Sequence, residues 1–133
     1  MSANILIIDD SEANLALSEY LLRSAGHRTV TATNGHQALQ LARTGQPDLI
    51  VCDLQMPAPD GYAVLAQLRQ EPDLRGVPVV AVTAYSRETD RTSVLMAGFD
   101  GYLSKPIDPE HFVEQIEQYL RRDLRGGAAA GRA

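Results

Sequence analysis

Short apolar runs and longer amphipathic segments alternate five times along the chain. The apolar runs predict strands, and the amphipathic segments that follow them predict helices. The predicted strands lie near residues 4–9, 28–33, 48–53, 77–82 and 100–104. The predicted helices lie near residues 12–25, 35–44, 61–70, 87–97 and 108–122. Strands that alternate with helices indicate a parallel sheet with helices on both faces, because the crossovers between parallel strands are right-handed.

The strand patterns also predict positions within that sheet. The first, third and fourth runs are apolar throughout, which is typical of strands covered on both faces. The second run, residues 28–33, is rich in threonine and alternates between polar and apolar positions, which suits a strand at an edge of the sheet.

Residues with known preferences mark the helix ends. Ser11 is predicted to cap the first helix, and Gly26 and Gly98 to end the first and the fourth. Asp108-Pro109-Glu110 is predicted to begin the last helix, with a capping residue, a proline in the first turn and an acidic residue near the positive end of the dipole. The buried stripe of that helix is predicted to comprise Phe112, Ile116, Tyr119 and Leu120.

Composition and charge narrow the class of protein. The 133 residues are 44% hydrophobic and 22% charged, as expected for one soluble domain. No apolar run approaches the roughly 20 residues of a membrane span, and the N-terminus enters the first strand directly, so neither a membrane segment nor a signal peptide is predicted. The segment from Arg121 onward holds four arginines and one aspartate, which leaves eight basic and sixteen acidic residues in the rest. Residues 1–120 are therefore strongly acidic and are expected to bind nucleic acid poorly. A cytoplasmic location is expected.

Neither the cysteine nor the histidines indicate a disulfide or a metal site. Cys52 is the single cysteine, so it is predicted to be a buried core thiol rather than part of a disulfide. His27, His36 and His111 lack metal-ligand spacing and are predicted to be surface residues.

Polar and charged residues lie at the C-terminal ends of four predicted strands, where a functional site is expected. Asp9 and Asp10 follow the first strand, Asp53 ends the third, Thr83 follows the fourth and Lys105 follows the fifth. Ligands of an open parallel sheet bind outside the carboxyl ends of its strands, so these side chains should converge. Three clustered carboxylates repel one another, and a hard cation such as Mg²⁺ relieves that repulsion. An ammonium opposite carboxylates and a metal is a phosphate-binding arrangement, and Lys105 is the only lysine.

These residues, with the segment from Asp53 to Gly61, Thr83-Ala84 and Lys105-Pro106, resemble the receiver domain of response regulators in two-component signalling. Each motif alone is weak, but all occur in order and together cover about residues 4–122. The resemblance implies a flavodoxin-like (βα)5 fold with a five-stranded parallel sheet of order 2-1-3-4-5. Residues 1–122 would form the domain, and residues 123–133 a flexible tail.

The resemblance also implies roles for individual residues. Asp53 would be the phosphorylation site. Asp10 and Asp53, with the backbone carbonyl of Gln55, would bind Mg²⁺ or Mn²⁺ directly, and Asp9 mainly through water. The residues expected to bind the phosphoryl group or to act in the switch are Thr83, Ala84, Tyr102 and Lys105. Ala84 is small and leaves the approach to Asp53 open, and Pro106 is expected to follow a cis peptide bond.

The function implied is a phosphoacceptor signalling switch and not an enzyme acting on other substrates. A histidine kinase or a histidine phosphotransfer protein would donate the phosphoryl group. A downstream protein would bind the surface formed by the fourth helix, the fifth strand and the fifth helix. No direct contact with nucleic acid or membrane is expected, and the chain would be a monomer or a phosphorylation-dependent dimer. It would be a stand-alone receiver or part of a hybrid kinase or larger regulator.

Two other functions fit a carboxylate-rich α/β domain less well. Dehalogenase-like phosphatases and phosphotransferases usually carry two aspartates one residue apart after the first strand, whereas Asp9 and Asp10 are adjacent. A flavodoxin would need a hydroxyl-rich phosphate loop at that position, where the two aspartates would repel the FMN phosphate.

Overall fold

The computed structural model describes residues 2–84 and 88–120, with the backbone alone described at 88–90. The strands are β1 (Asn4–Ile8), β2 (Arg28–Ala32), β3 (Leu49–Asp53), β4 (Val79–Thr83) and β5 (Gly101–Ser104). The helices are α1 (Glu12–Ser24), α2 (Gly35–Gly45), α3 (Gly61–Gln70), α4 (Glu88–Met96) and α5 (Phe112–Glu117). The predicted tail, residues 123–133, lies outside the described residues.

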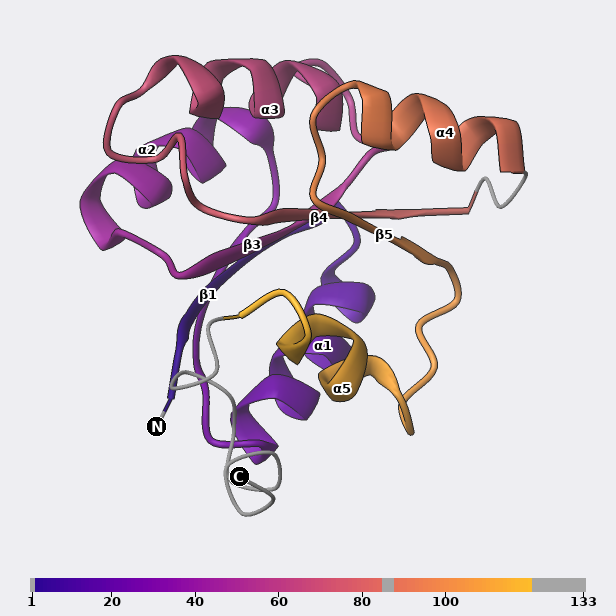
Figure 1. Cartoon of the computed structure of the whole chain (residues 1–133). Helices are drawn as coiled ribbons and strands as arrows, with labels where there is room; N and C mark the ends of the chain where they lie inside the picture. The colour runs from indigo at the N-terminus through magenta and orange to yellow at the C-terminus, as the bar shows by residue number, and fades with distance from the viewer. Residues whose placement is uncertain (1, 85–87, 121–133) are drawn as a thin grey trace.

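All five strands form one parallel sheet in the order β2-β1-β3-β4-β5. This confirms the predicted fold class, and the threonine-rich β2 lies at an edge as predicted. In Figure 1, α2, α3 and α4 cover one face of the sheet, and α1 and α5 cover the other. Ile8 pairs with Cys52, Asp53 with Val82, and Thr83 with Ser104, so the carboxyl ends of four strands meet at one edge.

The sheet separates two hydrophobic clusters. Along β1, Leu6 and Ile8 belong to the cluster under α2, α3 and α4, whereas Ile5 and Ile7 belong to the cluster under α1 and α5. Successive side chains of a strand point to opposite faces, so an inner strand needs apolar residues at every position. Cys52 is fully buried as predicted, and burial raises the pKa of its thiol above the usual value. No helix in the described part of the chain is long and apolar enough to span a membrane.

The predicted helix ends are present for α1 and α4. The side chain of Ser11 accepts a hydrogen bond from the backbone N–H of Asn14 and caps α1. Gly26 and Gly98, which follow α1 and α4, have φ angles of 94° and 112°. Glycine adopts this left-handed region without the steric cost that a Cβ atom imposes.

The last helix is shorter than predicted, because α5 begins at Phe112 rather than at Asp108. Asp108 instead organises a turn before the helix: its side chain accepts from the Glu110 N–H at 3.1 Å and lies 2.7 Å from Nδ1 of His111. A short acidic side chain that bonds its own neighbouring backbone competes with helix formation. The predicted stripe is nevertheless correct, with Phe112, Ile116 and Leu120 buried and Tyr119 half-buried.

The prediction that His27 is a surface residue was wrong. His27 is only 3% exposed, and its Nδ1 accepts from the Ala3 N–H at 3.1 Å. Nδ1 is therefore unprotonated, so Nε2 carries the hydrogen and donates to Glu117 in α5 at 2.7 Å. The two partners are 90 positions apart, and no local pattern reveals such a pair. His36 and His111 are exposed, as predicted.

The turn before α5 generates a testable pH dependence. The side-chain hydrogen bond and the charge of Asp108 raise the pKa of His111 above its usual value, and the same bond lowers the pKa of Asp108. Because the pKa of His111 is higher in the folded protein, its pairing with Asp108 contributes fully to folding stability below the pKa of the unfolded chain, about 6.5. That contribution is lost as the pH rises through the folded pKa. We expect an NMR titration to place the His111 pKa above 6.5, and Asp108→Asn to lower it. An unchanged titration in Asp108→Asn would contradict the pairing.

Candidate functional site

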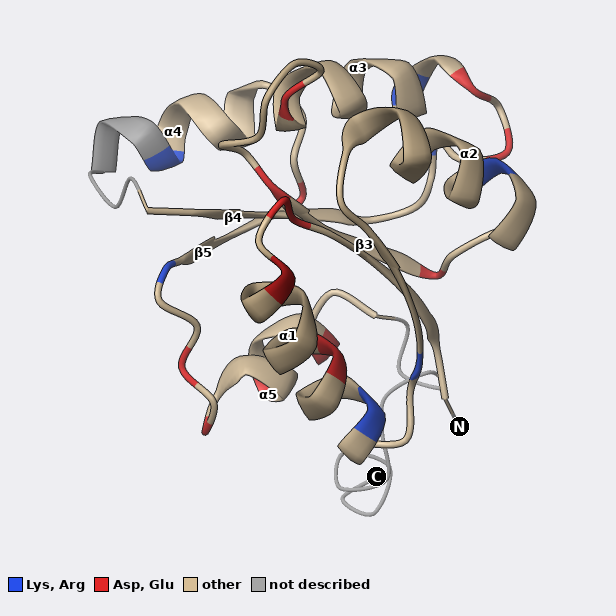
Figure 2. Ribbon diagram, turned by 180° about the vertical axis from the view of Figure 1, so that it is seen from behind, with Lys and Arg blue, Asp and Glu red and all other residues tan. Residues whose placement is uncertain are grey.

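The side chains that the sequence singled out converge at the carboxyl edge of the sheet. Asp9 and Asp10 follow β1, Asp53 ends β3, Thr83 ends β4 and Lys105 follows β5. In Figure 2, acidic positions lie where β1 and β3 end, and a basic position lies just beyond β5. The parallel register brings them together, as the strand-end argument predicted.

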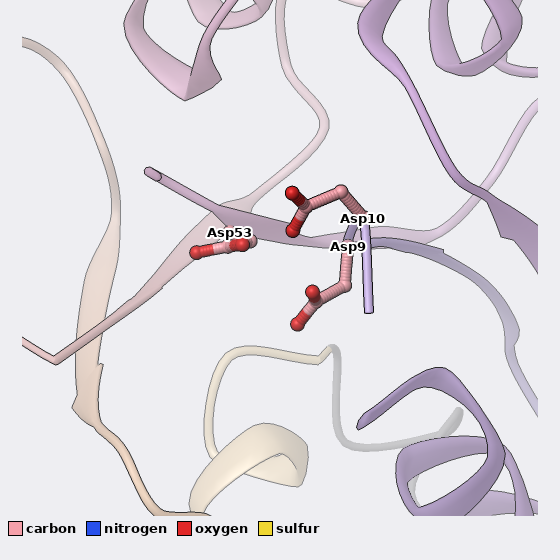
Figure 3. A group of neighbouring side chains, drawn as sticks. All are labelled: Asp9, Asp10 and Asp53. Atoms are coloured by element: carbon pink, nitrogen blue, oxygen red, sulfur yellow. The ribbon is translucent and has the colours of Figure 1, made fainter. Parts of the chain in front are cut away.

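Three carboxylates form the centre of this site. One oxygen from each of Asp9, Asp10 and Asp53 lies within 4.8 Å of the others. Figure 3 shows the side chains of the adjacent residues Asp9 and Asp10, whose carboxylates both lie toward Asp53. Asp9 and Asp53 are buried, whereas Asp10 is exposed, so the cluster opens to solvent on the side of Asp10.

Lys105 provides the positive charge of the site. Its Nζ lies 3.1 Å from Oδ1 of Asp53 and 3.5 Å from Oδ2 of Asp9. The backbone N–H of Lys105 donates to the carbonyl of Thr83 at 2.8 Å, which fixes the start of the chain after β5 against the end of β4. The peptide bond between Lys105 and Pro106 is cis, which is the geometry that the resemblance implied.

The carboxylates carry more negative charge than Lys105 offsets. Burial raises the pKa of Asp9 above its usual range; the charge of Asp53 adds to that effect, while the hydrogen bond from the Ser11 N–H and the charge of Lys105 oppose it. Three carboxylates share the site with one ammonium, which contacts only Asp53 and Asp9, so an excess of negative charge remains that a divalent cation would neutralise. The donor set is made of carboxylate oxygens, the ligands that Mg²⁺ prefers, so the residues present fit such an ion.

Gln55 lies against Asp53 and also reaches the loop after β4. Its backbone N–H donates to Oδ1 of Asp53 at 3.1 Å, and its side-chain Oε1 accepts from the Ala84 N–H at 3.2 Å. The resemblance implied that the backbone carbonyl of Gln55 binds the metal ion, and that role remains a prediction. The side-chain contact to Ala84 was missed, because it depends on how two loops meet.

Gly61 lets the loop after Asp53 fold back tightly. A Cβ atom at this position would lie 2.7 Å from the carbonyl oxygen of Asp53 and 2.9 Å from Cα of Leu54. Both neighbours are backbone atoms that cannot rotate away. The glycine that begins α3 is therefore required for close approach, which keeps the loop that holds Gln55 packed against the end of β3.

Thr83 and Tyr102 lie on the same face of the sheet. Thr83 is fully buried, and Tyr102 is half-buried and packs against the cluster under α2, α3 and α4. Tyr102 pairs with Ala81, and Thr83 pairs with Ser104, which makes Thr83 and Tyr102 diagonal neighbours. Tyr102 also lines a hollow of about 340 Å³ that opens beside β5, together with Pro106, Ile107 and Gln115 among others. Tyr102 thus lies near the strand end of the site and also borders a hollow at the surface.

Comparisons with known proteins agree with this geometry. The sequence model described as the response regulator receiver domain matches residues 5–117. The polar-differentiation response regulator DivK of Brucella anthropi is 38% identical over 120 residues, which cover 90% of this chain and 98% of that protein.

Solved structures give the same result. Chemotaxis response regulator CheY4 of Vibrio cholerae aligns with a TM-score of 0.85 and 26% identity, over 90% of this chain and 100% of that one. The receiver domain of the sensor histidine kinase PA1611 from Pseudomonas aeruginosa, which has a magnesium ion coordinated in its active site cleft, aligns with a TM-score of 0.80 and 31% identity over 90% and 98% of the two chains.

The charge excess predicts that removing a buried carboxylate stabilises the metal-free protein. Asp9→Asn keeps an oxygen that can accept from Ser11 and removes the charge that burial disfavours. We expect the free energy of unfolding in EDTA to rise by about 1 kcal/mol, measured by urea denaturation. Saturating Mg²⁺ should stabilise the wild type more than the variant. Asp73→Asn, at an exposed position, is the control; a variant less stable than wild type in EDTA would refute the explanation.

Proposed function

Because the chain belongs to the response regulator receiver domain family, we propose that it is a phosphoacceptor switch of a two-component or phosphorelay system. Asp53 accepts a phosphoryl group from a histidine kinase or a histidine phosphotransfer protein, with Mg²⁺ bound beside it. The observation that carries this proposal is the position of Asp53 at the end of β3, where it contacts the Lys105 ammonium and lies within 4.8 Å of two further carboxylates. The protein acts in the cytoplasm as a regulator, and its chemistry is limited to gaining and losing its own phosphoryl group.

The transfer needs little from the protein beyond position and charge. The P–N bond of the donor phosphohistidine breaks as a P–O bond forms to a carboxylate oxygen of Asp53. The imidazole nitrogen keeps the electron pair of the broken bond, and Asp53 becomes an acyl phosphate. Lys105 then faces the new negative charge, while the Thr83 hydroxyl and the Ala84 N–H are the donors at the end of β4 that can reach a phosphoryl oxygen.

A divalent ion would supply the positive charge that Lys105 alone does not. Asp10 and Asp53 would hold Mg²⁺ with the backbone carbonyl of Gln55, and Asp9 would act through water; Mn²⁺ could take the same place. Two facts support this assignment: the clustered carboxylate oxygens of this chain, and the magnesium ion in the active site cleft of the related PA1611 receiver domain.

The donor histidine belongs to another protein or domain. His27 is buried against Glu117, which leaves it unavailable to a reaction partner. Phosphorylation of Asp53 then alters binding of a downstream protein to the surface of α4, β5 and α5. The hollow beside Tyr102 is part of that surface, and Thr83 and Tyr102 are the pair through which the site would act on it.

The first test is chemical. Incubation with acetyl phosphate and Mg²⁺ should add one phosphoryl group to the wild type, as measured by the mass of the intact protein. Asp53→Asn should add none, EDTA should abolish the reaction, and Asp10→Ala should weaken Mg²⁺ binding. Asp73→Asn should react as the wild type does. Labelling of Asp53→Asn at the wild-type rate would rule out Asp53 as the acceptor.

The second test concerns Thr83. A charge-assisted hydrogen bond contributes about 1.5–3 kcal/mol, so its loss should reduce the shift toward the active state by roughly tenfold or more. We expect Thr83→Ala still to bind beryllofluoride, a phosphoryl mimic, at Asp53, but with a much smaller change in the NMR signals of the Tyr102 ring. Ser104→Ala, at the exposed register partner of Thr83, is the matched control. Equal ring responses in Thr83→Ala and wild type would show that Thr83 does not carry the coupling.

A further inference from the structure

The side chain of Gln55 connects two loops across the mouth of the site. Gln55 is fixed at one end by its own N–H, which donates to Oδ1 of Asp53 at 3.1 Å. At the other end, its side-chain oxygen accepts the Ala84 N–H at 3.2 Å. Gln55 and Ala84 are both exposed, so this contact lies at the entrance and not in the core. It joins the loop after β3 to the chain that leaves β4.

The Ala84 N–H carries a single hydrogen and cannot fully serve two acceptors. Ala84 directly follows Thr83 at the carboxyl end of β4, on the edge where a group attached to Asp53 would stand. A phosphoryl group brings three anionic oxygens, and an N–H bonded to an anionic oxygen forms a stronger hydrogen bond than one bonded to a neutral amide. A phosphoryl oxygen that takes this N–H must therefore displace the Gln55 oxygen.

We propose that Gln55 is a positioning residue that holds the Ala84 N–H in the unphosphorylated protein and competes with the phosphoryl group for it. This inference rests on the proposed function. Breaking the hydrogen bond between Gln55 and Ala84 would cost free energy on activation, and that cost would depend on the side chain at position 55. Release of Ala84 from Gln55 also frees the backbone at the end of β4 to move when Asp53 is phosphorylated. Gln55 thus favours the inactive arrangement by one neutral hydrogen bond.

The size of the effect follows from the kind of bond. An exposed neutral hydrogen bond has a small net value, so its loss corresponds to a change in affinity of about two- to tenfold. Gln55→Met removes the acceptor oxygen and keeps a side chain of similar length. Gln55→Ala removes the acceptor and the bulk together. Gln67→Met makes the same replacement at an exposed position of α3, away from the site, and is the matched control.

The experiment measures beryllofluoride affinity in saturating Mg²⁺ for the four proteins. We expect Gln55→Met and Gln55→Ala to bind about two- to tenfold more tightly than wild type, and Gln67→Met to match wild type. Tighter binding by Gln55→Ala alone would mean that Gln55 only shields the entrance, which would overturn the proposal. Unchanged or weaker binding by both variants would overturn it as well.

A second measurement separates this inference from the proposed function. Exchange of the Ala84 amide hydrogen, followed by NMR without Mg²⁺ or beryllofluoride, should be faster in Gln55→Met than in wild type and in Gln67→Met. An unchanged exchange rate would overturn the role of Gln55 while leaving the function of Asp53 intact. A wild type that binds no beryllofluoride would instead refute the proposed function, and the competition with it.

Discussion

The contact between the Lys105 ammonium and the Asp53 carboxylate allows a cluster of like charges to stand at the end of a buried strand. Asp53 is 2% exposed, and an unpaired buried carboxylate would destabilise the fold strongly. Lys105 reaches Asp53 at 3.1 Å and Asp9 at 3.5 Å, so one cation serves both buried acids. The arrangement remains short of positive charge, and that shortage makes the site receptive to a divalent ion. The buried apolar residues of β1, β3 and β4 stabilise the fold and offset the repulsion among the carboxylates at the strand ends.

The strand patterns predict the fold and the place of the site because both follow from local rules. An apolar run covered on both faces marks an inner strand, and the strand ends of a parallel sheet share one edge. What the sequence does not reveal depends on contacts between distant segments. His27 is buried because Glu117 reaches it from α5, and Gln55 meets Ala84 because two loops converge. The start of α5 was misplaced because Asp108 bonds its own neighbours instead of capping the helix.

The sheet separates two hydrophobic clusters, and Thr83 of the site lies on the face of only one of them. Thr83 lies on the face of the sheet that α2, α3 and α4 cover, and Tyr102 packs against the same cluster. A movement of Thr83 toward Asp53 would vacate volume on this face, and a close-packed interior tends to refill such volume. The Tyr102 ring is the large neighbouring side chain. On the opposite face, α1 and α5 pack on a separate cluster, and the buried pair of His27 and Glu117 ties α5 to the start of β1 and β2.

The contacts at the mouth of the site indicate how strong such a switch can be. The loops after β3 and β4 are joined by a neutral hydrogen bond from the Ala84 N–H to the Gln55 side chain. Its replacement by a charge-assisted bond would gain about 1–2 kcal/mol, the difference between typical values for the two kinds of bond. That difference changes an equilibrium by roughly five- to thirtyfold. If Asp53 carries a phosphoryl group as proposed, the Thr83 hydroxyl at the preceding position would be a second donor to that group, and its hydrogen bond would add to this shift.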